Sequence, residues 1–373
     1  MPTSLALYLN SANPDQRWRT LDRAIFANLD DLRQGCTSLS EDEQLRVRIR
    51  WARQNDDHRV YDPQCPLWGC VHPLWTGPRD FTLRDLGVQT LTRNLGTVPA
   101  TASMLSSQSI KSFVEGIDTS VSPASIVFGG HGDGPYAVVA MFGEADAVAS
   151  DDSPSWLTPA ELTRGLREAG FGPNRRFQVI GFDNCQQASL ELAIELRDFA
   201  LCLVAAQLNV PGIGWSYRDW PALALHGADA PQLAQAMVDS YRARYDSKRY
   251  PSQTMTSVEL SPMNEIASAL HGFCDRALSL PDASELRRLR SIRTPLPTMP
   301  MSQVAKVDAF ALFDAFAQDP GADAAMRANA TRICAGIAAA TQGSWIPPSV
   351  ASAYSAHGLS IVFPAASSDV SDV

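Results

Sequence analysis

The chain has 373 residues, of which 45% are hydrophobic, and a formal net charge of −9 at pH 7. This length suits one large domain or two ordinary ones with a real core, and the negative charge argues against a nucleic-acid partner. No apolar run reaches the roughly eighteen residues that would span a bilayer, so we expect no membrane partner.

The cysteines are scattered and odd in number, seven in all. No Lys or Arg precedes the short apolar run within residues 1–10, and no small-residue cleavage site follows it. These features predict reduced thiols and no signal peptide, and therefore a cytoplasmic protein.

The spacing of apolar residues predicts strands and helices that alternate along the first two thirds of the chain. Strands are predicted at 4–9, 43–52, 125–128, from 177 to the turn before Cys185, 201–206 and 359–363. Helices are predicted at 21–33, 108–118, 159–169, 186–197, 231–245, 262–279, 303–317 and 322–340. This order predicts an α/β fold with a parallel sheet.

The pattern of apolar residues changes at residue 231, after which helical spacing dominates. We predict a core over 1–230, a mainly helical subdomain over 231–366 that returns a late strand, and a frayed tail over 367–373.

The segment 54–80 is rich in Pro, Trp and Asp and contains Cys65, Cys70 and His72. A structural zinc site needs a CxxC-type pair and a second pair of ligands, which this spacing does not supply. We interpret the segment as a surface insertion and predict no metal site.

Two apolar strands end in reactive side chains, His131 within Gly129–Gly134 and Cys185 after Gly181-Phe182-Asp183-Asn184. Parallel strands separated by a crossover bring such ends to one edge of the sheet. A helix beginning directly after Cys185 would favour its thiolate, and the imidazole could take the thiol proton. The N–H groups of Gly132 and Cys185 could bind an oxyanion, an interaction often worth about 3–4 kcal/mol per donor.

Each of these residues also has a structural interpretation when taken alone. A cysteine at a strand end is commonly a small core residue, and a Gly-Gly-His-Gly segment can be a plain tight turn. We assign Cys202, Cys274 and Cys334 to apolar packing. The other histidines lie away from strand ends and are interpreted as surface or structural residues.

The ordered set of motifs resembles the clostripain (C11) family of cysteine peptidases, in the caspase-like clan. The segments that carry the resemblance are His131-Gly132, Gly181–Cys185, 189–197, 203–205, Pro211–Tyr217, 307–316 and 358–364. The resemblance implies a caspase-like mixed, mostly parallel sheet flanked by helices, with a helical C-terminal subdomain. It also implies a cysteine endopeptidase in which His131 and Cys185 form a catalytic dyad and protein or peptide is the substrate.

The resemblance places Asp183 beside the substrate pocket and implies cleavage after Arg or Lys. Family members often carry acidic residues just before the Pro-Gly-x-Gly-Trp segment, whereas this chain has the uncharged residues 206–210. Asp183 and Asp219 are therefore the candidate pocket acids, with Trp215 beside them, and the preference for basic P1 residues stays open. We expect no cofactor. Only the family resemblance suggests calcium as one.

Two other functions compete with the peptidase. The altered segment 206–210 and Asn184 would fit a catalytically silent caspase-like module that binds a protein. A flavodoxin-like ligand binder would explain the strand order, but the Gly-rich helix start that such sheets use for phosphate is missing.

Overall fold

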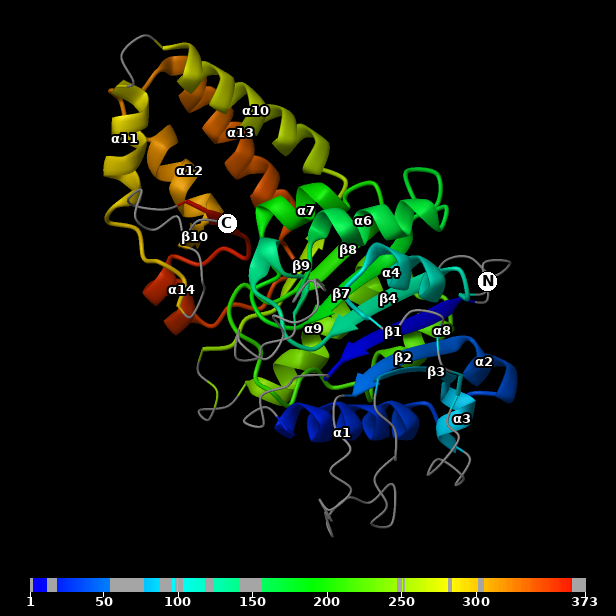
Figure 1. Ribbon diagram of the computed structural model, residues 1–373. Helices are drawn as coiled ribbons and strands as arrows, with labels where there is room; N and C mark the ends of the chain where they lie inside the picture. The colour runs from blue at the N-terminus through cyan, green and yellow to red at the C-terminus, as the bar shows by residue number, and fades with distance from the viewer. Residues whose placement is uncertain are drawn as a thin grey trace, which may run out of the picture.

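The structure is a computed structural model. It describes residues 3–11, 19–53, 77–87, 96–97, 99, 103–117, 124–140, 156–246, 250, 252–280, 284–300 and 305–363. The fold is α/β: helices cover a central twisted sheet, and a group of C-terminal helices lies beyond one end of it (Figure 1).

The central sheet has seven strands in the order β3-β2-β1-β4-β7-β8-β9. These are β1 (Ser4–Asn10), β2 (Val47–Arg53), β3 (Gly77–Thr82), β4 (Ala124–Gly129), β7 (Phe177–Asp183), β8 (Ala200–Ala205) and β9 (Thr256–Glu259). The five inner strands are parallel, and the edge strands β3 and β9 are antiparallel to their neighbours. The strands β1, β4 and β7 are buried along their whole length, as expected of a sheet covered on both faces. The mostly parallel mixed sheet predicted from the sequence is confirmed.

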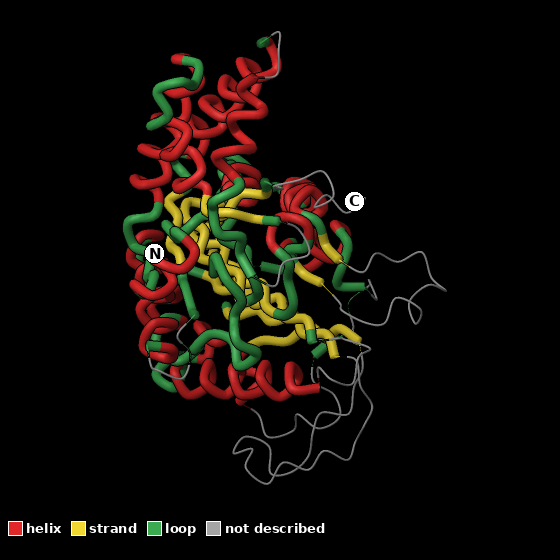
Figure 2. The backbone as a smooth tube through the Cα atoms, turned by 90° about the vertical axis from the view of Figure 1, so that its left-hand side faces the viewer, coloured by secondary structure: helices red, strands yellow, loops and turns green. Residues whose placement is uncertain are grey.

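Helices pack on both faces of this sheet, and the two faces carry separate apolar clusters (Figures 1 and 2). One face is covered by α4 (Ser107–Val114), α6 (Pro159–Glu168) and α7 (Leu190–Leu196). The other is covered by α1 (Arg19–Gly35), α3 (Leu83–Gly87), α8 (Pro221–Leu225) and α9 (Ala230–Tyr245).

The C-terminal group contains the helices α10 to α14 and a small antiparallel sheet. Its elements are α10 (Met263–Ser279), α11 (Ser284–Arg293), β10 (Lys306–Asp308), α12 (Ala309–Ala317), α13 (Ala324–Ala340), α14 (Pro348–Tyr354) and β11 (Ser360–Val362). Two elements past residue 230 belong with the central sheet instead: α9 packs on it and β9 is its edge strand. The division at 230 predicted above therefore does not follow the packing, in which the helical group begins with α10. The tail 367–373 lies outside the described residues.

The segment predicted as a strand at 43–52 is a short helix followed by a strand. Helix α2 (Glu41–Leu45) begins at a capping box in which Ser40 and Glu43 exchange hydrogen bonds, and this local signal overrides the alternating pattern. The strand is less exposed than its charges suggest, because Arg50 is buried and donates to Asp80 of β3 at 2.6 Å.

Strand register sets the positions of the two reactive residues. Gly129 of β4 pairs with Asp183 of β7, and the N–H of Gly130 donates to the carbonyl oxygen of Asp183 at 3.3 Å. His131 and Cys185 each lie two residues beyond this pair, at the carboxyl ends of adjacent parallel strands.

Candidate active site

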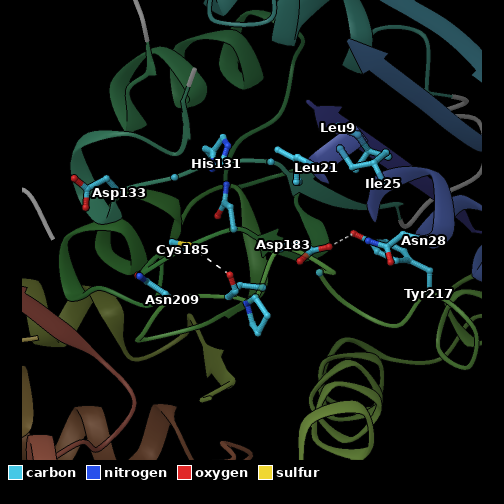
Figure 3. Close-up of a pocket in the computed structure, with 18 residues that line it drawn as sticks. Leu9, Leu21, Ile25, Asn28, His131, Asp133, Asp183, Cys185, Asn209 and Tyr217 are labelled. Carbon is cyan, nitrogen blue, oxygen red and sulfur yellow. Dashed lines mark hydrogen bonds between the residues drawn. The ribbon is translucent and has the colours of Figure 1, made fainter. Parts of the chain in front are cut away.

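A cavity of about 480 Å³ lies at the carboxyl ends of β1, β4 and β7 (Figure 3). Its lining residues are Leu9, Leu21, Ile25, Asn28, Gly129, Gly130, His131, Gly132, Asp133, Asp183, Asn184, Cys185, Asn209, Val210, Pro211, Gly212, Gly214 and Tyr217. Both reactive side chains predicted from the sequence therefore line one cavity. In Figure 3 they lie on one side of the view, while Asn28 and Tyr217 lie on the other.

Cys185 lies in a tight turn that neighbouring amide side chains hold in place. Gln186 has φ = 61°, a left-handed conformation unusual for a residue with a side chain. Its amide donates to Asn209 Oδ1 at 2.7 Å and to the carbonyl oxygen of Pro300 at 2.9 Å. The amide of Gln187 donates to the carbonyl oxygens of Ala137 and Cys185. Strain of this kind persists where surrounding contacts fix it, commonly at functional sites.

The helix expected directly after Cys185 begins later. Residues 186–189 continue alongside the end of β8, and α7 begins at Leu190 with Ser189 as its N-cap. The predicted stabilisation of a Cys185 thiolate by a helix N-terminus is therefore wrong. The left-handed turn and the pairing that follows it keep the helix away from the sulfur.

Burial controls the protonation of both reactive groups. It raises the pKa of the Cys185 thiol above its ordinary value, and the thiol hydrogen bonds to the carbonyl oxygen of Val210 at 3.7 Å. It lowers the pKa of His131 to about 4. At neutral pH the pair is therefore a neutral thiol and a neutral imidazole. An uncharged imidazole can accept a proton.

Asp183 is one of two buried carboxylates that line the cavity, and the other, Asp133, faces Lys306. The backbone N–H of Trp215 lies 3.0 Å from each oxygen of Asp183, and the Tyr217 hydroxyl donates to Asp183 Oδ2 at 2.9 Å. Burial raises the pKa of Asp183 to about 6, and the two donors oppose that rise.

The other predicted site residues have different surroundings. The Trp215 ring packs beneath the sheet, where a Cβ added to Gly181 would lie 3.0 Å from it, so only the Trp215 backbone serves the site. Asp219 is exposed and lies outside the cavity lining. Gly132 lies in the lining and admits no side chain, since a Cβ there would come within 2.6 Å of the Gln187 amide.

Sequence reasoning missed one wall of the cavity, which comes from α1. Leu21, Ile25 and Asn28 have the spacing of one helical face and all three line the cavity. The periodicity of this helix was detectable, but the cavity it borders depends on tertiary packing.

Sequence reasoning also missed a buried charge cluster beside the cavity. The Lys306 side chain on β10 has no exposed surface, and its Nζ lies 3.5 Å from Asp133 Oδ1. Glu191 of α7 also attracts this ammonium, and it accepts a hydrogen bond from the N–H of Val362 at 2.8 Å. Burial lowers the pKa of Lys306, while the two carboxylates raise it. The cluster therefore connects the loop of His131, the helix after Cys185 and the C-terminal strands.

No three His, Cys, Asp or Glu side chains of the described residues gather in a group that could hold zinc or calcium. Cys65, Cys70 and His72 lie outside those residues. Within the same ranges, no helix has the length and apolar character needed to cross a bilayer.

A mostly parallel sheet that presents a thiol and an imidazole at one cavity is the arrangement expected of a cysteine peptidase. The model of the clostripain family matches residues 85–323, which is more than half of the chain. The chain therefore belongs to the clostripain family, and it is a cysteine-type peptidase. Among curated proteins, none matches the chain.

Solved structures agree with this fold assignment. An inactive zymogen C11 protease from Parabacteroides distasonis matches with a TM-score of 0.64 and 14% identity, over 97% of this chain and 92% of that one. A secreted C11 cysteine protease from Bacteroides thetaiotaomicron matches with a TM-score of 0.59 and 16% identity, over 92% and 87% of the two chains. A secreted C11 cysteine protease from Bacteroides thetaiotaomicron in complex with an irreversible peptide inhibitor matches with a TM-score of 0.60 and 14% identity, over 97% of this chain and 92% of that one. Both Bacteroides thetaiotaomicron structures are described as secreted proteases. This description contradicts the cytoplasmic location predicted from the sequence, and that prediction is wrong.

Proposed function

We propose that the protein is an endopeptidase in which Cys185 is the nucleophile and His131 the proton carrier. The observation that carries the proposal is their common placement: each lies two residues beyond the paired residues Gly129 and Asp183, and both line one cavity. The neutral imidazole expected at pH 7 is the form that can accept the thiol proton.

The reaction has two stages. The thiol proton moves to His131 as the sulfur attacks the scissile carbonyl carbon, and the backbone N–H groups of Gly132 and Cys185 bind the resulting oxyanion. His131 then gives the proton to the leaving amine, which releases the first product and leaves a thioester. His131 next activates water, which attacks the thioester and regenerates the thiol as the acid product leaves.

The P1 side chain enters the part of the cavity between α1 and residues 209–217. The apolar side chains Leu21 and Ile25 flank this space, and Asp183 is its carboxylate. An apolar passage that ends at the buried carboxylate of Asp183 suits a long basic side chain, which buries its stem and pairs its charge. We therefore propose cleavage after basic residues. Asp219 has no place in this pocket.

A labelling experiment tests the nucleophile. A peptidyl chloromethyl ketone with lysine at P1 is expected to add one mass adduct to the wild-type chain and none to Cys185→Ala. The matched control is Cys274→Ala, which removes an exposed thiol of α10 and is expected to keep the adduct. An adduct on Cys185→Ala at the wild-type rate would exclude Cys185 and favour the silent binding module.

The pH dependence of cleavage tests the role of Asp183. Its pKa is raised to about 6, so the carboxyl group is neutral below that pH and loses its attraction for a cation. The kcat/KM for a peptide with lysine at P1 is expected to fall about tenfold per pH unit below this point. A matched peptide with uncharged norleucine at P1 is expected to keep its kcat/KM until His131 protonates, near pH 4. Parallel profiles for the two peptides would contradict the assignment of Asp183.

A further inference from the structure

The carboxylate of Asp183 is already occupied on two of its sides. The N–H of Trp215 is equidistant from the two oxygens, at 3.0 Å from each, and so is shared between them. The Tyr217 hydroxyl takes Oδ2 at 2.9 Å. Oδ1 is left as the oxygen that can accept a further donor.

This occupation matters because a guanidinium and an ammonium bind carboxylates differently. Arginine binds best through two parallel N–H donors, one to each oxygen of the carboxylate. The N–H of Trp215 occupies the position between the two oxygens from which a guanidinium would bind both. The Tyr217 hydroxyl occupies Oδ2, which a guanidinium approaching from the side would need. Lysine is a compact charge and can pair with one oxygen.

A second acceptor lies beside Asp183. The amide nitrogen of Asn28 donates to the carbonyl oxygens of Ile213 and Trp215, at 3.1 Å each, which turns its oxygen to the side of Gly214. A Cβ on Gly214 would lie 2.7 Å from both this amide atom and Asp183 Oδ2. Gly214, with φ = 62°, thus lets both side chains lie closer to its backbone than any residue with a Cβ would allow.

The rest of this end of the cavity is largely apolar. Leu9 and the α1 residues Leu21 and Ile25 supply no hydrogen-bond acceptors from their side chains. An ammonium has three donors, which Asp183 Oδ1, the Asn28 oxygen and one water can satisfy. A guanidinium brings five donors, and those left without acceptors would be buried at a cost.

We propose that this pocket selects lysine over arginine at P1, and that the Tyr217 hydroxyl is a specificity-determining group. The inference rests on the proposed endopeptidase function and on Asp183 as the pocket acid. With one or two guanidinium N–H groups left unpaired, the wild-type kcat/KM is expected to favour lysine by about 10- to 100-fold.

The test uses four peptides that differ only at P1, with lysine, arginine, norleucine or alanine, at pH 8, where Asp183 is ionised. Tyr217→Phe keeps the ring and frees Oδ2 for a second guanidinium N–H. Its lysine-to-arginine ratio is expected to fall at least fivefold, through a gain for arginine. The matched control is Tyr241→Phe on α9, whose buried hydroxyl donates to Gln253 and lies outside the cavity lining. Its ratio is expected to equal that of wild type.

The possible outcomes distinguish a failure of this inference from a failure of the proposed endopeptidase function. Equal cleavage after lysine and arginine by the wild type overturns the selection of lysine, and an unchanged ratio in Tyr217→Phe overturns the role of the Tyr217 hydroxyl. Either result leaves the endopeptidase proposal intact. Norleucine cleaved as well as lysine overturns Asp183 as a cation site, and the inference with it. Failure to cleave any peptide, together with no labelling of Cys185, overturns the endopeptidase function itself. If Tyr217→Phe does not fold, the wild-type ratio alone decides.

Discussion

His131→Ala is expected to lower kcat by about 100- to 10,000-fold, the usual contribution of a positioned proton carrier. Burial raises the pKa of the Cys185 thiol, so almost no thiolate exists at neutral pH without a base. In the proposed mechanism the imidazole therefore removes the proton during attack, because no pre-formed ion pair supplies the thiolate.

The pH profile of this variant separates a chemical role from a structural one. Without its base, Cys185 reacts only as free thiolate, so the residual rate is expected to rise about tenfold per pH unit through neutral pH. The matched control is His271→Ala, which removes a histidine that is 79% exposed on α10 and is expected to keep the wild-type rate. A loss of less than about fivefold in His131→Ala would exclude the imidazole as the base.

Lys306→Met is expected to lower the free energy of unfolding by about 3–5 kcal/mol, the usual cost of breaking a buried ion pair from one side. The substitution preserves most of the side-chain volume and removes the ammonium that lies 3.5 Å from Asp133. Asp133 and Glu191 would then be left buried without their shared cation. Urea unfolding followed by circular dichroism measures the change.

Two further variants show whether charge is the cause. Lys306→Met combined with Glu191→Gln removes one of the two stranded carboxylates and is expected to be more stable than Lys306→Met alone. Lys111→Met breaks a surface contact with Glu115, in which the two groups lie 4.0 Å apart and are largely solvated, and should change stability by less than about 1 kcal/mol. Equal unfolding midpoints for Lys306→Met and Lys111→Met would contradict the role of the buried cluster.

The strands that carry the dyad could be predicted from sequence because their signal is local. Each is a short apolar run that ends in glycine and a polar residue, and a parallel sheet places such ends at one edge. His131 and Cys185 were predicted in this way. The family resemblance added Asp183 as a residue of the substrate pocket.

The rest of the pocket could not be predicted, because it depends on contacts between distant segments. Leu21 and Ile25 carry the spacing of an ordinary core-facing helix, and nothing local shows that part of this face borders a cavity. Asp219 and Trp215 are close in sequence to the pocket loop, yet one is exposed and the other packs under the sheet. The position of Lys306 depends on the pairing of β10 with β11.

The start of the helix after Cys185 was misplaced for a different reason. Residues 186–197 have helical spacing, but the backbone amides of Gln186 and Ala188 donate to carbonyl groups at the end of β8. Tertiary hydrogen bonds thus outweigh helical propensity over the first four residues of this segment.

The strand β11 also bears on when the site can form. The N–H of Ser360 donates to the carbonyl oxygen of Ala188 at 2.9 Å, so the segment just past the nucleophile is secured by a residue 172 positions later. At about 5–20 residues per second, a ribosome needs roughly 9–34 s to synthesise that interval. A nascent chain would carry its sulfur and imidazole throughout this time without a completed site. Proteolytic competence should therefore arise only after residue 360 has been synthesised.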